Sequence, residues 1–186
     1  MVAQPEPPRW SVEDYLEMEC ASSIRHEFLD GHVYAMAGGS RRHSRLGVNV
    51  LTLLASRLRG RPCRVFNSDM KVRIDARHFV YPDAAVSCDS RDLDDEDPSF
   101  ISFPALIVEV LSENSTADYD RGGKFDLLYS RLPSLREYML LTADSVGIEI
   151  RRRGPTGDWM VDRYGPEDIV IMESINGNFP IADFYL

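Results

Sequence analysis

The segment from Ala105 to Leu111 reads Ala-Leu-Ile-Val-Glu-Val-Leu, and it constrains the fold of this chain more than any other stretch. It is short, almost wholly apolar and bounded by Pro104 and Ser112, a pattern that predicts a strand buried on both faces. One carboxylate, Glu109, interrupts the apolar run. Because an ionised carboxylate is costly there, we expect it to meet a cation or several donors. Either a metal ion or a structural ion pair would serve.

A second carboxylate, Asp83, lies in the strand-like segment Phe79–Ser87. Its neighbour Pro82 cannot donate to a strand ladder, so it marks a sheet edge, a bulge or the start of a strand. Bulges and strand ends are places where a sheet turns a side chain toward a site. The alternative is that Asp83 merely follows a proline at a turn.

A lysine follows these two carboxylates in a segment that predicts a helix. Asp118 or Asp120 can cap this helix, which is expected to run to about Leu132. Its apolar positions share one face and are Phe125, Leu128, Tyr129 and Leu132. Lys124 lies at the edge of that face. Its side chain can extend to water or reach a carboxylate of the sheet.

Upstream, the segment Arg25–Tyr34 predicts a β-hairpin, with Asp30-Gly31 supplying the turn. Glu27 shares one face of the first strand with Arg25. This carboxylate either belongs to the same site as Asp83 and Glu109 or forms a cross-strand ion pair.

A helix is predicted from about Arg41 to Arg59, and Gly60 fits its end. Arg41 and Arg42 lie at its positive end, where the helix dipole disfavours cations. A DNA phosphate or an acidic loop nearby would offset that cost. His43 is either a ligand, a phosphate donor or a polar first-turn residue.

The order of these residues resembles the Uma-two family of endonucleases, within the PD-(D/E)XK nuclease superfamily. The resemblance rests on the following pieces: Glu27 with Gly31, His43, Pro82-Asp83, Glu109-Val110-Leu111-Ser112, Asp120-Arg121 with Lys124 and Tyr129, and Glu137-Tyr138. It extends from about Ser11 to Leu186. It implies an α/β fold with a restriction-endonuclease-like core, that is, a mixed central β-sheet flanked by helices, with a C-terminal β extension. We expect one nuclease-like domain over residues 11–186, after a disordered or extended N-terminus over residues 1–10.

The resemblance also implies the chemistry of the site. Asp83 and Glu109 would hold Mg²⁺ or Mn²⁺, together with the carbonyl of Val110, and a metal-bound water would attack a DNA phosphodiester. Lys124 would orient that water or stabilise charge on the phosphate. Glu27 would be an additional metal ligand, or it would contact the ligands without binding the metal itself.

The chain departs from the family pattern at two positions. The superfamily usually places its lysine two residues after the second acid, where this chain has Leu111, so Lys124 is taken as its replacement. Met139 stands where the family usually has tryptophan, which indicates a packing change.

The net charge of −9 argues against a broad nucleic-acid-binding surface, because nonspecific DNA affinity comes mostly from cation–phosphate contacts. Two other readings therefore stand beside the endonuclease. One is an inactive nuclease-fold binding module, and the other is a hydrolase of another phosphodiester or a nucleotide. The resemblance also suggests a homodimer, since two sites are a simple way to cut two strands.

The three cysteines, Cys20, Cys63 and Cys88, lie far apart and form no CxxC motif. This spacing predicts neither a disulfide framework nor a zinc site, and favours a reducing cytoplasm. The polar, proline-rich start is unlike a signal peptide, and no apolar run is long enough to span a membrane.

Overall fold

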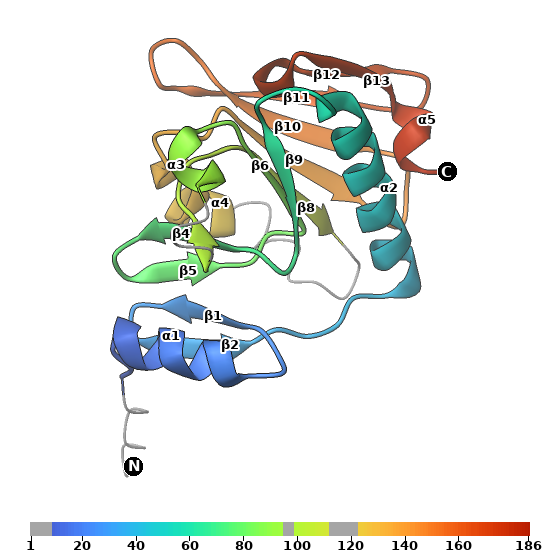
Figure 1. The fold of residues 1–186 in the computed structure, drawn as a ribbon. Coiled ribbons are helices and arrows are strands. Elements are labelled where there is room, and N and C mark those ends of the chain that lie inside the picture. Colours follow the sequence, from blue (N-terminus) through green and yellow to red (C-terminus); the bar gives the residue numbers. More distant parts are fainter. Residues whose placement is uncertain (1–8, 95–98, 112–122) are drawn as a thin grey trace, which may run out of the picture.

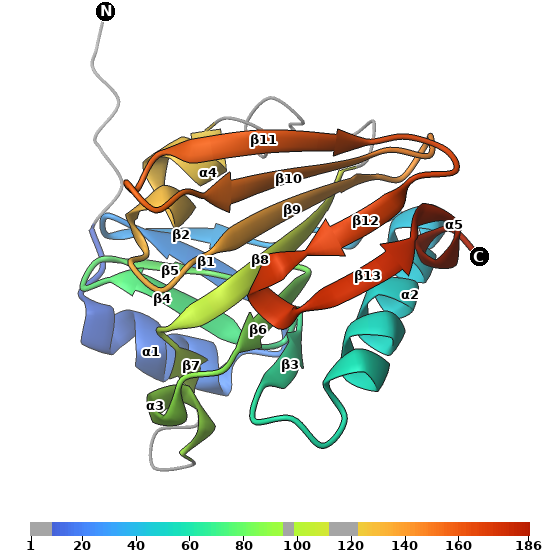
Figure 2. The same ribbon diagram turned by 90° about the horizontal axis from the view of Figure 1, so that it is seen from above.

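The computed structural model describes residues 9–94, 99–111 and 123–186. Most of the predicted N-terminal tail, and the helix caps expected at Asp118 and Asp120, lie outside these residues. The body of the molecule is a six-stranded sheet in the order β11-β10-β9-β8-β6-β3 (Figure 2). Its strands are β3 (Arg64–Asn67), β6 (Ala84–Ser87), β8 (Pro104–Leu111), β9 (Glu137–Thr142), β10 (Ile148–Arg153) and β11 (Trp159–Tyr164). The sheet is mixed, because β8 and β9 are parallel and the other neighbours are antiparallel.

Strand β8 runs through the middle of this sheet and is buried on both faces, as the sequence predicted. Leu106 and Val108 face a core cluster that includes α2 (Arg41–Leu58). Ile107 and Leu111 face a second cluster, on the side of α4 (Lys124–Leu127). The two-residue period of a strand therefore sorts its side chains between two cores.

The C-terminal segment completes the first of these cores. Strands β10 and β11 extend the central sheet, while the hairpin of β12 (Ile169–Met172) and β13 (Gly177–Pro180) packs on the same face as α2, next to α5 (Ile181–Phe184) (Figure 2). Glu137 on β9 connects this hairpin to the central sheet. Its fully buried carboxylate accepts hydrogen bonds from the backbone N–H groups of the short 3₁₀-helix η3 (Glu173–Ile175). The predicted β extension is thus part of the core.

A second sheet, in the order β2-β1-β5-β4-β7, covers the other face together with α4 (Figure 1). Its strands are β1 (His26–Leu29), β2 (His32–Ala35), β4 (Lys71–Asp75), β5 (His78–Val80) and β7 (Phe100–Ile101). Helix α1 (Val12–Ala21) closes this sheet with Tyr15, which stacks on Phe28. The turn between β1 and β2 is Asp30-Gly31, with both residues at positive φ, which confirms the predicted hairpin.

Two predicted elements are shorter than expected. The segment Phe79–Ser87 is divided between β5 and β6, which belong to different sheets, and Pro82 lies at the crossing. The predicted helix to Leu132 ends after one turn of α4 at Leu128, whose backbone leaves the helical region, and a 3₁₀-helix, η2 (Tyr129–Arg131), follows.

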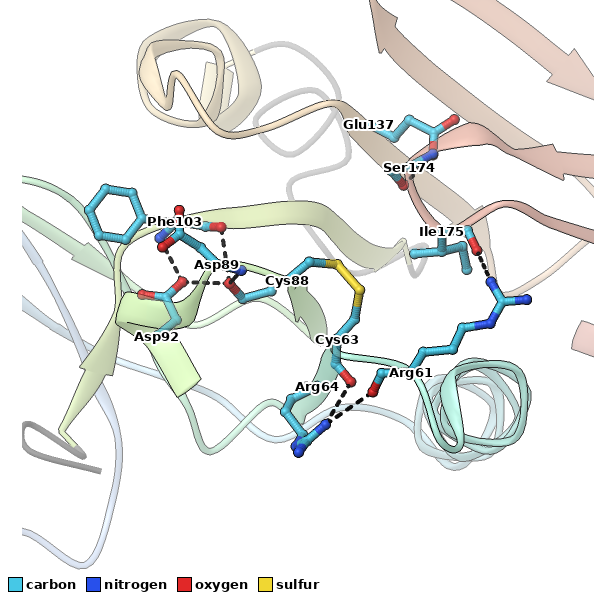
Figure 3. The surroundings of a disulfide bond; sticks show 11 residues. Arg61, Cys63, Arg64, Cys88, Asp89, Asp92, Phe103, Glu137, Ser174 and Ile175 are labelled. Atoms are coloured by element: carbon cyan, nitrogen blue, oxygen red, sulfur yellow. Dashed lines mark hydrogen bonds between the residues drawn. A yellow bond between two sulfur atoms is a disulfide. The ribbon is translucent and has the colours of Figure 1, made fainter. Parts of the chain in front are cut away.

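The prediction from the cysteine spacing was wrong, because Cys63 and Cys88 form a disulfide with an S–S distance of 1.98 Å (Figure 3). Cys63 precedes β3 and Cys88 follows β6. Since these strands pair antiparallel with Arg64 opposite Ser87, the two cysteines also face each other. The cysteines therefore give no support to a reducing compartment, and a cytoplasmic location stays a prediction. None of the described helices has the length and apolar character needed to cross a membrane.

Candidate active site

Asp83 and Glu109 come together through the pairing of two neighbouring strands. Strands β6 and β8 are antiparallel with Ala84 opposite Val108, so the preceding Asp83 stands opposite Glu109. The Asp83 N–H lies 3.4 Å from Glu109 Oε2, and the Val110 N–H donates to Asp83 Oδ2 at 2.7 Å. Both carboxylates therefore belong to one site at the N-terminal end of β6.

Lys124 reaches this pair from α4. Its ammonium lies 3.0 Å from Glu109 Oε1 and 2.9 Å from Glu27 Oε1, and only 6% of the residue is exposed. Glu27 comes from β1 in the second sheet. Side chains from both sheets and from α4 thus meet at one point, which is where the four predicted catalytic residues lie.

Burial sets the electrostatics of this cluster. It raises the pKa of Glu109 to about 7, helped by the nearby charge of Asp83 and opposed by Lys124. Burial alone disfavours the charged ammonium of Lys124. The carboxylates of Glu109 and Glu27 outweigh it, however, and hold the pKa of that lysine above its usual range. The cluster therefore pairs a charged lysine with a carboxylate whose pKa lies above its usual value.

Sequence reasoning missed the part that Tyr129 takes in this site. Tyr129 was expected on the apolar helix face and among the residues of the family resemblance, with no role in the site, but its buried hydroxyl donates to Glu109 Oε1 at 2.8 Å. Burial, followed by the charge of Glu109, raises the pKa of this tyrosine well above its usual value. A tyrosine among buried helix positions is a usable signal, because its hydroxyl needs a partner there.

His43, predicted at the start of α2, lies beside the cluster. Its Nε2 is 3.2 Å from Asp83 Oδ2. A Cβ on Gly39 would come within 2.6 Å of His43 Nδ1, so a glycine there leaves room for the imidazole. Arg42 lies 3.3 Å from Asp144, so an acidic residue of the protein offsets the charge of this arginine, as in the acidic-loop alternative to a DNA phosphate. Arg41 is exposed.

A cleft of about 700 Å³ opens beside Asp83 and His43. One wall is α2, and the opposite wall comes from the end of α1 and the segments flanking the β1–β2 hairpin. Tyr81 also lines the cleft and donates its hydroxyl to Glu19 at 2.6 Å. Of the cluster residues, Asp83 lines this cleft, so the cluster borders a cavity of ligand size.

The donor chemistry of the cluster suits a hard divalent cation, because Asp83, Glu109 and the Val110 backbone offer oxygen atoms. Within residues 9–94, 99–111 and 123–186, no three His, Cys, Asp or Glu side chains are grouped so that they could hold a metal by themselves. A cation at Asp83 and Glu109 would accordingly need backbone or water ligands as well. Magnesium commonly keeps several waters, so the residues fit this ion.

Comparison with known proteins places this architecture in a family. Residues 12–181 match the model of the Uma2 (Uma-two) family, described as "Putative restriction endonuclease". Two relatives come from Synechocystis sp. The uncharacterized protein slr1290 is 40% identical, over 96% of this chain and 92% of that protein, and the uncharacterized protein sll1609 is 31% identical, over 87% and 90%.

A crystal structure of a putative nuclease from Anabaena variabilis has the same fold. The match has a TM-score of 0.74 at 17% sequence identity and covers 94% of this chain and 97% of that chain. It confirms the restriction-endonuclease-like α/β core with its mixed sheet. From the family model, the relatives and the fold together, the chain belongs to the Uma2 family of restriction-endonuclease-like proteins.

Proposed function

We propose that this protein is a metal-dependent endonuclease that hydrolyses phosphodiester bonds of DNA. The observation that carries the proposal is the meeting of Asp83, Glu109 and Lys124 at one point beside an open cleft. Membership of a family described as "Putative restriction endonuclease" supports the same function.

In this proposal Asp83 and Glu109 would hold Mg²⁺ or Mn²⁺ with the Val110 carbonyl, and the metal would supply an activated water. Lys124 is the cation available to stabilise negative charge on the phosphate, because Glu109 and Glu27 keep it protonated. Tyr129 and Lys124 both contact Oε1 of Glu109. The other carboxylate oxygen, Oε2, faces Asp83. Glu27 would position the lysine.

The direct test is cleavage of supercoiled and linear DNA with Mg²⁺ or Mn²⁺, with EDTA as the blank. Asp83→Asn and Glu109→Gln should each lower the rate by at least about a hundredfold, the usual loss when transition-state charge stabilisation is removed. Asp92→Asn is the matched control. Its carboxylate also accepts backbone N–H groups, from Ser102 and Phe103 at 2.8 Å, but it lies outside the cluster. Equal cutting by all three variants would contradict the assignment.

One observation favours an inactive binding module instead. Lys124 already bridges Glu27 and Glu109, so the cluster is also a self-sufficient ion-pair network. Calorimetric titration with Mn²⁺ separates the two functions, because the nuclease should bind the ion and lose that binding in Glu109→Gln. An absence of heat in the wild type would favour the binding module.

A further inference from the structure

Among the described residues, no contact requires glycine at position 47. It lies in the interior of α2, where glycine is among the weakest helix formers. A Cβ built at this position would meet no atom of the described residues within 4 Å, so no close approach requires its absence. Gly47 does line the cleft beside Asp83 and His43. The lack of a side chain at Gly47 therefore keeps that space open, although it lowers the stability of the helix.

The size of the cleft suits a ligand of small-molecule size, such as one nucleotide. A volume of about 700 Å³ lies within the usual range for small-molecule pockets, roughly 300–1,000 Å³. A base-paired duplex, whose major groove alone is about 12 Å wide, could lie only across the opening. A single unpaired nucleotide could enter.

The charge of the cleft excludes a run of phosphates. Its described lining carries three carboxylates, Glu19, Asp69 and Asp83, against the guanidinium of Arg25 and the imidazole of His43. Arg25 is itself paired with Asp69. A strand backbone is drawn to cations, which this lining offers sparingly. A neutral base suits the cleft better, with one phosphate held at the Asp83 end, where a metal ion would offset its charge.

The remaining lining can recognise a base. It combines hydrogen-bonding groups with apolar surface, from Ser44, Asn67 and Ser68 on one hand and Met36, Val48 and Leu51 on the other. Hydroxyl and amide groups can bond the Watson–Crick edge of a base, which is free only when the base is unpaired. Val48 is more than half exposed, so apolar surface is available to a ligand.

We infer that this cleft holds an unpaired nucleotide of the DNA substrate next to the scissile phosphate. The inference rests on the proposed function and names its substrate class. It means that the protein binds and cuts single-stranded or locally unpaired DNA in preference to intact duplex.

The test uses one fluorescein-labelled sequence in three forms: single strand, fully paired duplex, and duplex with one bulged nucleotide. Binding is measured by anisotropy in Ca²⁺ at constant ionic strength, and cutting is measured separately in Mg²⁺ and Mn²⁺. The single strand and the bulged duplex should bind at least about tenfold more tightly than the paired duplex, a difference that one or two hydrogen bonds to an unpaired base can supply.

Gly47→Phe fills the cleft and should weaken single-strand binding by about tenfold. Gly47→Ala should bind nearly as the wild type does. Ala55→Phe is the matched control, because Ala55 is an exposed α2 residue two turns later that does not line the cleft. Gly47→Ala and Gly47→Phe should keep or raise the wild-type melting temperature, because each replaces a glycine, the weakest of these helix formers, in open space. Ala55→Phe should lower it only slightly, because Ala55 is exposed and phenylalanine is a weaker helix former than alanine.

Equal affinity for the paired duplex, or an unaffected Gly47→Phe, would overturn the inference. Cutting without any preference would overturn it and leave the proposed function standing. The predicted binding pattern without cutting would overturn the proposed function and the cutting part of the inference, and would leave only a cleft that binds an unpaired nucleotide. Neither binding nor cutting would overturn both proposals. Should Gly47→Phe lower the melting temperature, the wild-type comparison of the three DNA forms still decides.

Discussion

Replacing Lys124 by methionine should destabilise the protein strongly, because it leaves the buried carboxylate of Glu109 and the partly buried carboxylate of Glu27 without their cation. Lys124 lies within 3.0 Å of both Glu27 and Glu109 and is almost fully buried. Methionine keeps most of the apolar stem of the side chain and removes the charge. The loss therefore reports on the ion pairs more than on packing.

The expected loss is about 3–5 kcal/mol of unfolding free energy at pH 8, the range for removing one partner of a buried ion pair. The double variant Lys124→Met with Glu109→Gln should regain part of the lost unfolding free energy, because it no longer contains one of the two uncompensated charges. Arg163→Met is the control. Its side chain is three-quarters exposed and pairs with Glu149 at 3.1 Å, so its loss should stay below about 1 kcal/mol.

The loss should also depend on pH. In the wild type, the pKa of Glu109 is already raised from 4.5 to about 7, and Lys124 holds it down, so it should rise further in Lys124→Met. When the folded-state pKa of an acid exceeds its unfolded value, the folded state binds more protons, and stability falls as pH rises between the two values. Lys124→Met should therefore be more stable at pH 6 than at pH 8.

Urea unfolding followed by tryptophan fluorescence, at pH 6 and pH 8, measures these quantities. The slope of free energy against urea should match the wild type, so that the midpoint reports stability. A loss below about 1 kcal/mol at pH 8, or equal stability of Lys124→Met at both pH values, would refute the argument that burial makes these carboxylates depend on Lys124.

Three further predictions can be checked by the same unfolding assay. Tyr129→Phe keeps the ring but removes the hydrogen bond to Glu109, and should cost about 1.5–3 kcal/mol; a neutral result would mean that this bond contributes nothing. Reduction of the Cys63–Cys88 disulfide, which spans 25 residues, should cost roughly 3 kcal/mol in the wild type and nothing in Cys63→Ser; an unchanged wild type would argue against the bond. Glu137→Ala should cost about 3–5 kcal/mol and speed amide exchange in the last hairpin, and slow exchange there would show that other contacts hold it.

Local patterns explain which predictions of the fold were right. The β8 strand and its two faces follow from a two-residue period and an apolar composition. The β1–β2 hairpin follows from Asp30-Gly31, since few other residues adopt the backbone of that turn. The α2 helix follows from its period and from Ser40, whose hydroxyl accepts the His43 N–H at its start.

The wrong prediction about the cysteines concerns a contact between segments far apart in the chain. Cysteine spacing alone does not reveal that Cys63 and Cys88 stand opposite each other, because that depends on the register of β3 against β6. The division of the Phe79–Ser87 segment between two sheets was also open, since Pro82 is compatible with an edge, a bulge or a strand start.

The amino-acid sequence by itself determined that Glu109 must be buried in a strand and must have a partner, because burial and charge are properties of the local pattern. Only the tertiary structure decided which partners it has. Asp83 reaches it through strand register, while Lys124 and Tyr129 reach it through the packing of α4 and the turn after it on the sheet. Such contacts depend on how distant elements pack in three dimensions, which no local pattern in the chain encodes.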